Sequence, residues 1–170
     1  MTSTYIGSPP NVFFDTDFTL IIWIKFLSNQ RYNQIIKFTN VNSADSFSLY
    51  LNFDGTALQS RVTNNGSQDA YMFAGLIPIN SWMQITFVYK FSMGFIYVNG
   101  VKKNEVSQLP PSLLNKTIQF GPLDTMVDEI KLYKGALNDT EILNDYLLNA
   151  PRKFYLNLIF YFNSNTNFIF

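Results

Sequence analysis

Two neighbouring segments of alternating polarity constrain the fold of this chain most. The first covers Trp82–Tyr89 and the second covers Phe95–Gly100. Successive side chains of a strand point to opposite faces, so a polarity repeat of two residues predicts an amphipathic β-strand. Asn99 and Gly100 tolerate the positive φ of a tight turn. We therefore expect two strands of one sheet here. The apolar file of the first strand comprises Met83, Ile85, Phe87 and Tyr89.

The segment Phe18–Phe26 alternates in the same way, but apolar side chains lie on both of its faces. Ile21 and Trp23 belong to the face opposite the main apolar file. A strand with two apolar faces is typical of a position that is covered on both sides. We interpret Trp23 and Trp82 as packing residues rather than as platforms on which a sugar ring stacks, because both are embedded in apolar strands.

A hairpin is predicted in the middle of the chain. Phe47–Phe53 alternates cleanly, Asp54 and Gly55 provide a turn, and Thr56–Thr63 returns. Shorter strands are expected at Ile35–Phe38 and Ile118–Phe120.

One helix is predicted near the C-terminal end. Asn138 can accept hydrogen bonds from the first free amides, and Glu141 completes a capping-box pattern. The expected apolar stripe comprises Ile142, Leu143, Tyr146 and Leu147. Many short strands followed by one short helix predict an all-β fold, an antiparallel β-sandwich of the jelly-roll type.

Length and composition narrow the classes of function. A chain of 170 residues is about one domain. The formal charge is zero and the 12 Lys and Arg residues are scattered, so we expect no nucleic-acid partner. No apolar run reaches the ~20 residues that a spanning helix needs, so we expect no membrane insertion. We assign 1–150 to the jelly-roll domain.

The residue inventory argues against an enzyme. The chain has no His and no Cys, which excludes imidazole bases, His-containing triads and thiolate nucleophiles. Glycoside hydrolysis needs only two carboxylates across a cleft, but the chain has just three glutamates, Glu105, Glu129 and Glu141. We interpret Glu141 as a helix cap, Glu129 as facing away from Ile130 on its strand, and Asp128 as accepting from a nearby backbone amide.

Asp69 and Tyr71 are the ligand-contact candidates that the residues themselves suggest. They lie in a polar stretch after the turn-forming Asn64-Asn65-Gly66, which we interpret as a loop. Loops at the ends of a sandwich commonly carry binding residues. The sequence therefore predicts a contact with a ligand at this place.

Four spaced motifs together resemble a known family, the concanavalin A-like jelly rolls of the laminin G and pentraxin type. The resemblance covers about residues 5–148 and implies a fold that hosts lectins, adhesion modules, calcium sites and glycoside hydrolases. The motifs are Phe18-Thr-Leu-x-x-Trp23-Ile-Lys25, Trp82-x-x-Ile-Thr-Phe-Val-Tyr89, Tyr97-Val-Asn-Gly100 and Asp128-Glu-Ile-Lys-Leu-Tyr133-x-x-Ala136-Leu137 followed by Glu141-Ile142.

The chain departs from the family pattern at its two ends. Family domains open with an additional apolar strand, and this chain starts too late to supply it. A similar pattern occurs instead at 156–162. We therefore interpret 151–170 as a closing strand that completes the sheet, or as the start of a following repeat in a larger multidomain chain.

The resemblance also implies a calcium site. Ca²⁺ needs only oxygen ligands. By position in the family pattern, Asp45 precedes one strand and Asp124 ends the loop Gly121-Pro-Leu-Asp124. Ser46 stands where the family has Asn, and the loop lacks the family's Glu and Gln. The alternative is that both aspartates are solvated turn residues that accept local amides.

These observations predict a non-catalytic recognition or adhesion module that binds a glycan or a protein, assisted by Ca²⁺ and located outside the cell or on its surface. Two alternatives stay open. One is a structural spacer of a larger multi-repeat extracellular protein, and the other is a degenerate glycoside hydrolase. Carboxylates that converge on one ion would favour binding, and two carboxylates facing each other across a cleft would favour the hydrolase.

Overall fold

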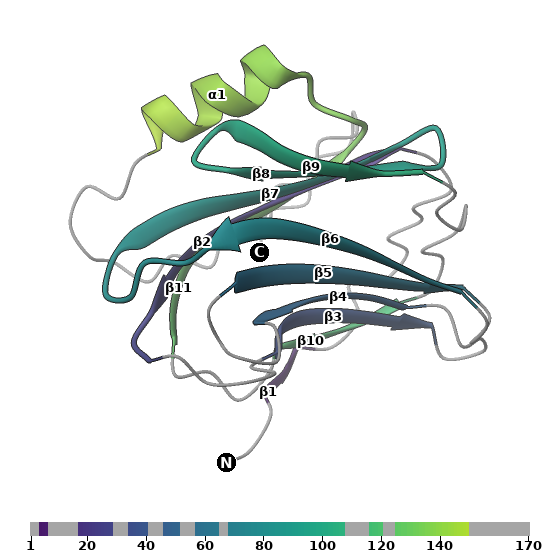
Figure 1. The fold of residues 1–170 in the computed structure, drawn as a ribbon, viewed down its shortest axis with the longest axis horizontal. Coiled ribbons are helices and arrows are strands. Elements are labelled where there is room, and N and C mark those ends of the chain that lie inside the picture. The colour runs from purple at the N-terminus through teal and green to yellow at the C-terminus, as the bar shows by residue number, and fades with distance from the viewer. Residues whose placement is uncertain are drawn as a thin grey trace.

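The computed structural model of the protein describes residues 4–6, 17–28, 34–40, 46–51, 57–64, 68–107, 116–120 and 125–149. The described strands form two antiparallel sheets that pack face to face, with one helix outside them (Figure 1). This arrangement confirms the predicted all-β sandwich with one short helix. In spatial order, the six-stranded sheet contains β1 (Thr4–Ile6), β10 (Lys116–Phe120), β3 (Gln34–Asn40), β4 (Ser46–Leu51), β5 (Ala57–Asn64) and β6 (Gln68–Leu76). The five-stranded sheet contains β11 (Thr125–Lys134), β2 (Phe18–Phe26), β7 (Trp82–Lys90), β8 (Met93–Val98) and β9 (Val101–Val106).

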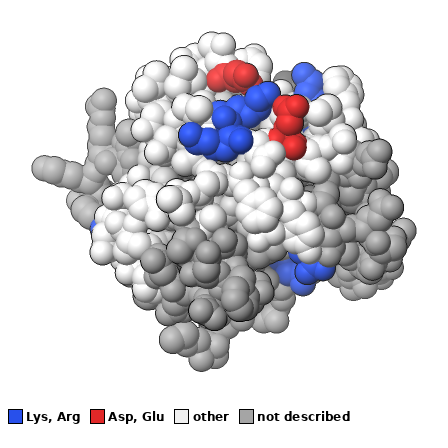
Figure 2. All heavy atoms as spheres, viewed as in Figure 1, with Lys and Arg blue, Asp and Glu red and all other residues white. Residues whose placement is uncertain are grey.

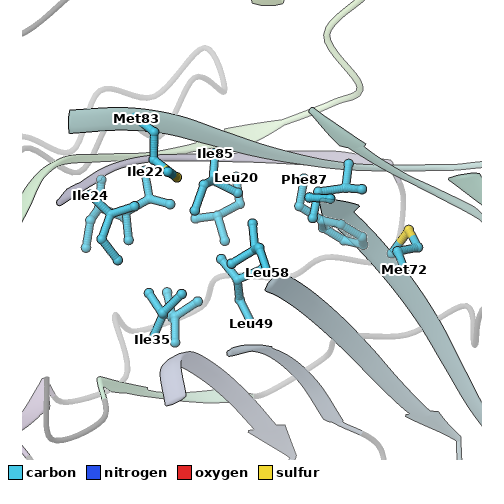
Figure 3. Packing of buried hydrophobic residues seen from close by; sticks show 14 of the residues in the cluster. Leu20, Ile22, Ile24, Ile35, Leu49, Leu58, Met72, Met83, Ile85 and Phe87 are labelled. Carbon is cyan, nitrogen blue, oxygen red and sulfur yellow. The ribbon is translucent and has the colours of Figure 1, made fainter. Parts of the chain in front are cut away.

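The core lies between the two sheets. Figure 3 shows Leu20, Ile22, Ile24, Met83, Ile85 and Phe87 of the five-stranded sheet opposite Ile35, Leu49, Leu58 and Met72 of the six-stranded sheet. The predicted apolar files of β2 and β7 are thus confirmed. Burying one such side chain stabilises the fold by roughly 1.5–3 kcal/mol, so these files dominate the stability.

The two sheets meet along their edge strands β6 and β9, which lie side by side. The Asn104 side chain of β9 donates a hydrogen bond to the Phe73 carbonyl oxygen of β6 at 3.3 Å. The β4–β5 hairpin and the short strands β3 and β10 confirm the sequence predictions. Strands β6 and β9 were not predicted, because both are edge strands whose side chains are largely polar or exposed.

The β8–β9 turn packs beneath the helix. Asn99 and Gly100 have φ values of 52° and 75°, as the sequence predicted for a tight turn. The Asn99 side-chain oxygen accepts from the backbone amide of Gln84 at 2.9 Å. A Cβ on Gly100 would lie 3.0 Å from Leu143 Cδ1. Glycine is therefore required here both by the backbone and by the helix above it.

A β-bulge interrupts β11 at Glu129. The register with β2 shifts between Asp128 and Ile130, and Glu129 has a φ of 41°. The Asp128 carboxylate accepts from the Glu129 backbone amide at 2.9 Å, which confirms the predicted backbone contact. The Glu129 carboxylate lies 3.2 Å from the Lys131 ammonium, on the strand face opposite Ile130, as expected.

The helix α1 (Asp139–Leu148) has the predicted capping box. The Glu141 amide donates to Asn138 Oδ1 at 3.0 Å, and the Asn138 amide donates to Glu141 Oε2 at 2.7 Å. The predicted apolar stripe is only partly right. Ile142 is buried, but Leu143 and Leu147 are exposed. Tyr146, which belongs to the predicted stripe, stacks on the buried Trp23 with ring centroids 5.7 Å apart, which confirms that Trp23 is a packing residue.

The expectation that the chain lacks a first strand is partly wrong. The three-residue strand β1 pairs with β10 at the edge of the six-stranded sheet, in the register Thr4 with Phe120. The segment 156–162 lies outside the described residues, so the closing-strand hypothesis stays a prediction. In the described part of the chain, no helix is long and apolar enough to cross a membrane.

Candidate functional site

Strand β6 presents two aromatic side chains on the outer face of the six-stranded sheet. Tyr71 and Phe73 are 41% and 49% exposed, whereas the alternating Met72 and Ala74 face the core. Two residues apart on a strand, the two rings point to the same side. The two large aromatic side chains therefore provide an apolar platform at this surface.

Polar side chains continue this platform across the sheet. In the sheet register, Tyr71 of β6 lies opposite Arg61 of β5, which in turn is followed by Ser48 of β4 and Lys37 of β3. Phe73 of β6 lies opposite Gln59 of β5. The Arg61 guanidinium lies 5.9 Å from the centre of the Tyr71 ring, within cation–π range. We call this surface the β6 face. It comprises Lys37, Ser48, Gln59, Arg61, Tyr71 and Phe73.

The predicted ligand residues Asp69 and Tyr71 are both in β6. The prediction that Tyr71 lies in a loop is therefore wrong. The polar stretch after the turn pairs with β5 as an edge strand, because one face of an edge strand can remain solvated. Asp69 pairs with Thr63 in the same register and is two residues from Tyr71. Its side chain lies outside the described set.

Sequence reasoning missed Arg61 and Phe73. The alternation of Tyr71, Met72, Phe73 and Ala74 is a weak strand signal that could have located Phe73. Arg61 joins the site only through the β5–β6 register.

The proposed calcium ligands Asp45 and Asp124 lie outside the described residues, so the calcium site stays a prediction. In the described part of the chain, no group of three or more acidic residues could hold a metal ion.

The three glutamates all have local partners. Glu105 pairs with Lys102 at 3.1 Å, Glu129 with Lys131 at 3.2 Å, and Glu141 caps α1. Each glutamate thus has a structural contact, and these contacts give the hydrolase alternative no support.

The ion pair between Lys131 and Asp145 is buried between α1 and the five-stranded sheet. The Lys131 ammonium lies 2.8 Å from Asp145 Oδ2, and the Gln84 side chain donates to Asp145 Oδ1 at 2.9 Å. Burial lowers the pKa of Lys131, but the hydrogen bond and attraction from Asp145, together with those from Glu129, outweigh it and raise the pKa above its ordinary value. Both oxygens of Asp145 are thus held by groups of the five-stranded sheet, so we interpret the cluster as the attachment of α1.

Comparisons with known proteins agree with this architecture. The family model of the concanavalin A-like lectin/glucanases superfamily, of laminin G type, matches residues 1–143. No curated protein sequence matches the chain.

Solved structures with a similar fold include binding proteins and a domain of an enzyme. A heptameric SAP-like pentraxin from Limulus polyphemus has a TM-score of 0.61 at 14% identity, over 89% of this chain and 83% of that one. Domain 4 of an extracellular arabinanase from Geobacillus stearothermophilus, in complex with arabinotriose, has a TM-score of 0.62 at 16% identity, over 76% and 66%.

A third similar structure is that of botulinum neurotoxin type C, described as entering cells through interaction with two ganglioside molecules. It has a TM-score of 0.64 at 17% identity, over 87% of this chain and 40% of that one. This chain thus spans less than half of the toxin structure. At these identities, the likeness shows a shared fold.

Proposed function

Because the chain belongs to the concanavalin A-like lectin/glucanase superfamily, we propose that it is a non-catalytic recognition module that binds a glycan on its β6 face. The observation that supports this proposal is the exposed pair Tyr71 and Phe73 next to Arg61. A pyranose ring has an apolar face of C–H groups that stacks on a flat aromatic ring, and its hydroxyl groups need hydrogen-bond partners nearby.

The chemistry of the β6 face matches a glycan better than it matches a buried protein interface. The two rings supply apolar area, while Lys37, Ser48, Gln59 and Arg61 supply donors and acceptors in adjoining register positions. Single exposed apolar residues are common on protein surfaces, but adjacent aromatic pairs with polar surroundings often mark binding sites. The arabinotriose complex of one similar structure, and the dependence of botulinum neurotoxin type C on ganglioside interaction, favour the same class of ligand.

The cellular setting is also a proposal. Recognition modules of this fold type commonly belong to extracellular or cell-surface proteins, and we propose that this chain acts there as part of a larger multidomain chain. Calcium binding by Asp45 and Asp124 stays a separate prediction, because the β6 face does not depend on it.

The test compares glycan binding by the native chain and two variants. A glycan array identifies a ligand, and titration calorimetry measures its Kd. Tyr71→Ala and Phe73→Ala should each weaken binding by about tenfold, which corresponds to about 1.4 kcal/mol. The matched control is Phe91→Ala, because Phe91 is also an exposed aromatic residue but lies in the β7–β8 turn.

Three outcomes separate the alternatives. A loss of affinity in the two β6 variants with an unchanged Phe91 variant supports the proposal. Equal affinity in all variants would place the glycan elsewhere. Absence of binding across the array would favour the structural spacer. Circular dichroism spectra must match the native chain, because a misfolded variant would mimic a loss of binding.

A further inference from the structure

A hollow of about 560 Å³ opens on the outer face of the five-stranded sheet, beside the start of α1. We call it the α1 hollow. Small-molecule sites in proteins commonly have volumes of about 300–1,000 Å³. The β6 face belongs to the outer side of the other sheet, so the two surfaces lie on opposite faces of the sandwich (Figure 1). The hollow is lined by Val88, Lys90, Phe95, Tyr97, Lys102 and 137–141.

The floor of the hollow is apolar and well anchored. Val88 and Tyr97 are buried and form a small core with Ile142, against which Phe95 and Leu137 pack. The Leu137 amide donates to the buried Thr19 hydroxyl at 2.9 Å, which fixes the segment that leads into α1. The hollow therefore has a rigid base formed by strands and a secured helix start, as a preformed site requires.

The rim carries both signs of charge in equal number. Lys90 and Lys102 come from β7 and β9, and Asp139 and Glu141 come from the first turn of α1. Charged side chains seen in Figure 2 gather near the top, where Figure 1 draws β8 and β9. These four lining groups sum to zero, but Glu105 lies 3.1 Å from the Lys102 ammonium, so the rim and this neighbour together carry one net negative charge and disfavour an anionic ligand.

The rim also offers unused donors and acceptors. The Tyr97 hydroxyl donates to Asp139 Oδ1 at 2.7 Å, and Glu141 Oε2 accepts from Asn138, so each carboxylate keeps a second oxygen. Burial, and then the hydrogen bond to Asp139, raise the pKa of Tyr97, so its phenol stays protonated as the donor in this contact. In the described part of the chain, the Lys90 ammonium has no ion pair and lies 5.4 Å from the Phe91 ring centre.

We propose that the α1 hollow is a second saccharide site that takes a neutral sugar residue. The inference rests on the proposed function of the module as a glycan binder. Each sugar hydroxyl both donates and accepts, so it matches a rim that mixes ammonium donors with carboxylate acceptors. The apolar C–H face of the ring matches the floor at Phe95 and Leu137. With the β6 face on the opposite sheet, the module would hold two glycan chains at once.

The test is a residue-resolved titration by NMR of the isotope-labelled chain. The probes are the methyl glycosides of glucose, galactose and arabinose, arabinotriose as a longer neutral ligand, and sialyllactose as an anionic comparison. At least one neutral probe should shift the backbone amide signals of Val88, Phe95 and Leu137 in a saturable way. Sialyllactose should bind the hollow at least about tenfold more weakly, because the three carboxylates of Asp139, Glu141 and Glu105 outnumber the two rim ammonium groups.

Two variants of α1 make the test specific. Thr140→Tyr fills the hollow from an exposed helix position, and Leu147→Tyr adds a comparable ring to an exposed position of the same helix outside the hollow. Thr140→Tyr should weaken binding of the neutral probe, measured from the signals of the hollow, by tenfold or more. Leu147→Tyr should leave this affinity unchanged, which controls for the stability of α1.

The outcomes distinguish this inference from the proposed function. Shifts at Arg61, Tyr71 and Phe73 without shifts at the hollow would overturn the second site alone. Shifts at the hollow without shifts on the β6 face would support the second site and overturn the proposed main site. The inference would also be overturned if the signals of the hollow still shift in Thr140→Tyr, or if sialyllactose shifts them more strongly than the neutral probes do.

Discussion

Removing Asp145 tests whether a buried ion pair attaches α1 to the five-stranded sheet. The side chains of Lys131 and Asp145 are only 6% and 11% exposed, and their charged atoms are 2.8 Å apart. The Asn149 side chain donates to Asp145 Oδ2 at 3.1 Å, and Gln84 donates to the other oxygen at 2.9 Å. In Asp145→Leu, the Lys131 ammonium therefore stays buried and loses its nearest counter-ion, with only Glu129 remaining nearby.

The expected cost follows from the burial of the pair. Breaking a buried pair by removing one partner costs about 3–5 kcal/mol when the remaining charge is left uncompensated, and Glu129 at 3.2 Å from Lys131 keeps the cost at the lower end, about 3 kcal/mol. For a chain of this size, each kcal/mol lowers the Tm by about 2–4 °C, so Asp145→Leu should lower it by roughly 6–12 °C. The double variant with Lys131→Met removes both charges and should recover more than half of this loss.

The assay is thermal and urea unfolding followed by circular dichroism and by Trp23 fluorescence. Trp23 stacks on Tyr146 of α1, so its emission reports directly on detachment of the helix. In a Trp82→Phe background it is the single tryptophan. The control is Lys102→Met, which breaks the exposed pair of Lys102 and Glu105 and should cost at most about 1 kcal/mol.

Two results would refute this reasoning. If Asp145→Leu costs no more than the Lys102 control, the buried pair does not attach the helix. If the double variant is as unstable as Asp145→Leu, the loss comes from the shape or the hydrogen bonds of Asp145 and not from an uncompensated Lys131 charge.

Three further predictions follow. The pKa of Lys131 is raised in the folded state, so its contribution to stability is complete below the unfolded-state pKa of about 10.4 and is lost as the pH rises through the folded-state pKa. Urea unfolding between pH 9 and 12 should show this loss of stability in the native chain and not in Lys131→Met. Gly100→Ala should destabilise the fold by more than Gly75→Ala, because both glycines have positive φ but only at Gly100 would the new Cβ meet α1; an equal Tm in the two variants would contradict a close contact. If Asp45 and Asp124 share a calcium ion, calcium at 100 times its Kd raises the free energy of unfolding by about 2.7 kcal/mol and either alanine variant abolishes the rise; an unchanged Tm at millimolar calcium rules the site out.

The core could be predicted from the sequence because its signal is local. The alternation in Phe18–Phe26 and Trp82–Tyr89 records which face of each strand is buried, whatever the neighbouring strands are. The turn at Asn99 and Gly100 and the helix start at Asn138 depend likewise on residues adjacent in sequence. Strand β6 escaped prediction because its polar start follows a turn and its apolar run, Tyr71–Ala74, has apolar residues on both faces and so shows no alternation in polarity.

The candidate sites were settled by tertiary structure. Tyr71 acquires its partners Arg61, Ser48 and Lys37 only when four strands pair in one register, and a shift of one residue would turn its ring to the other face. The α1 hollow likewise needs α1 to dock across β7, β8 and β9. The helix places Asp145 and Tyr146 against the sheet and Leu143 over the turn at Gly100, whereas Leu147 of the expected apolar stripe is exposed.

The sequence by itself determined the fold class, because periodicity, turn residues and a capping box are encoded within a few neighbouring positions. The placement of the polar and aromatic side chains that form surfaces was decided by tertiary structure. Such a surface gathers residues from strands far apart in the chain, and its geometry follows from the summed register and packing of the whole sandwich. No local pattern in a single strand contains that information.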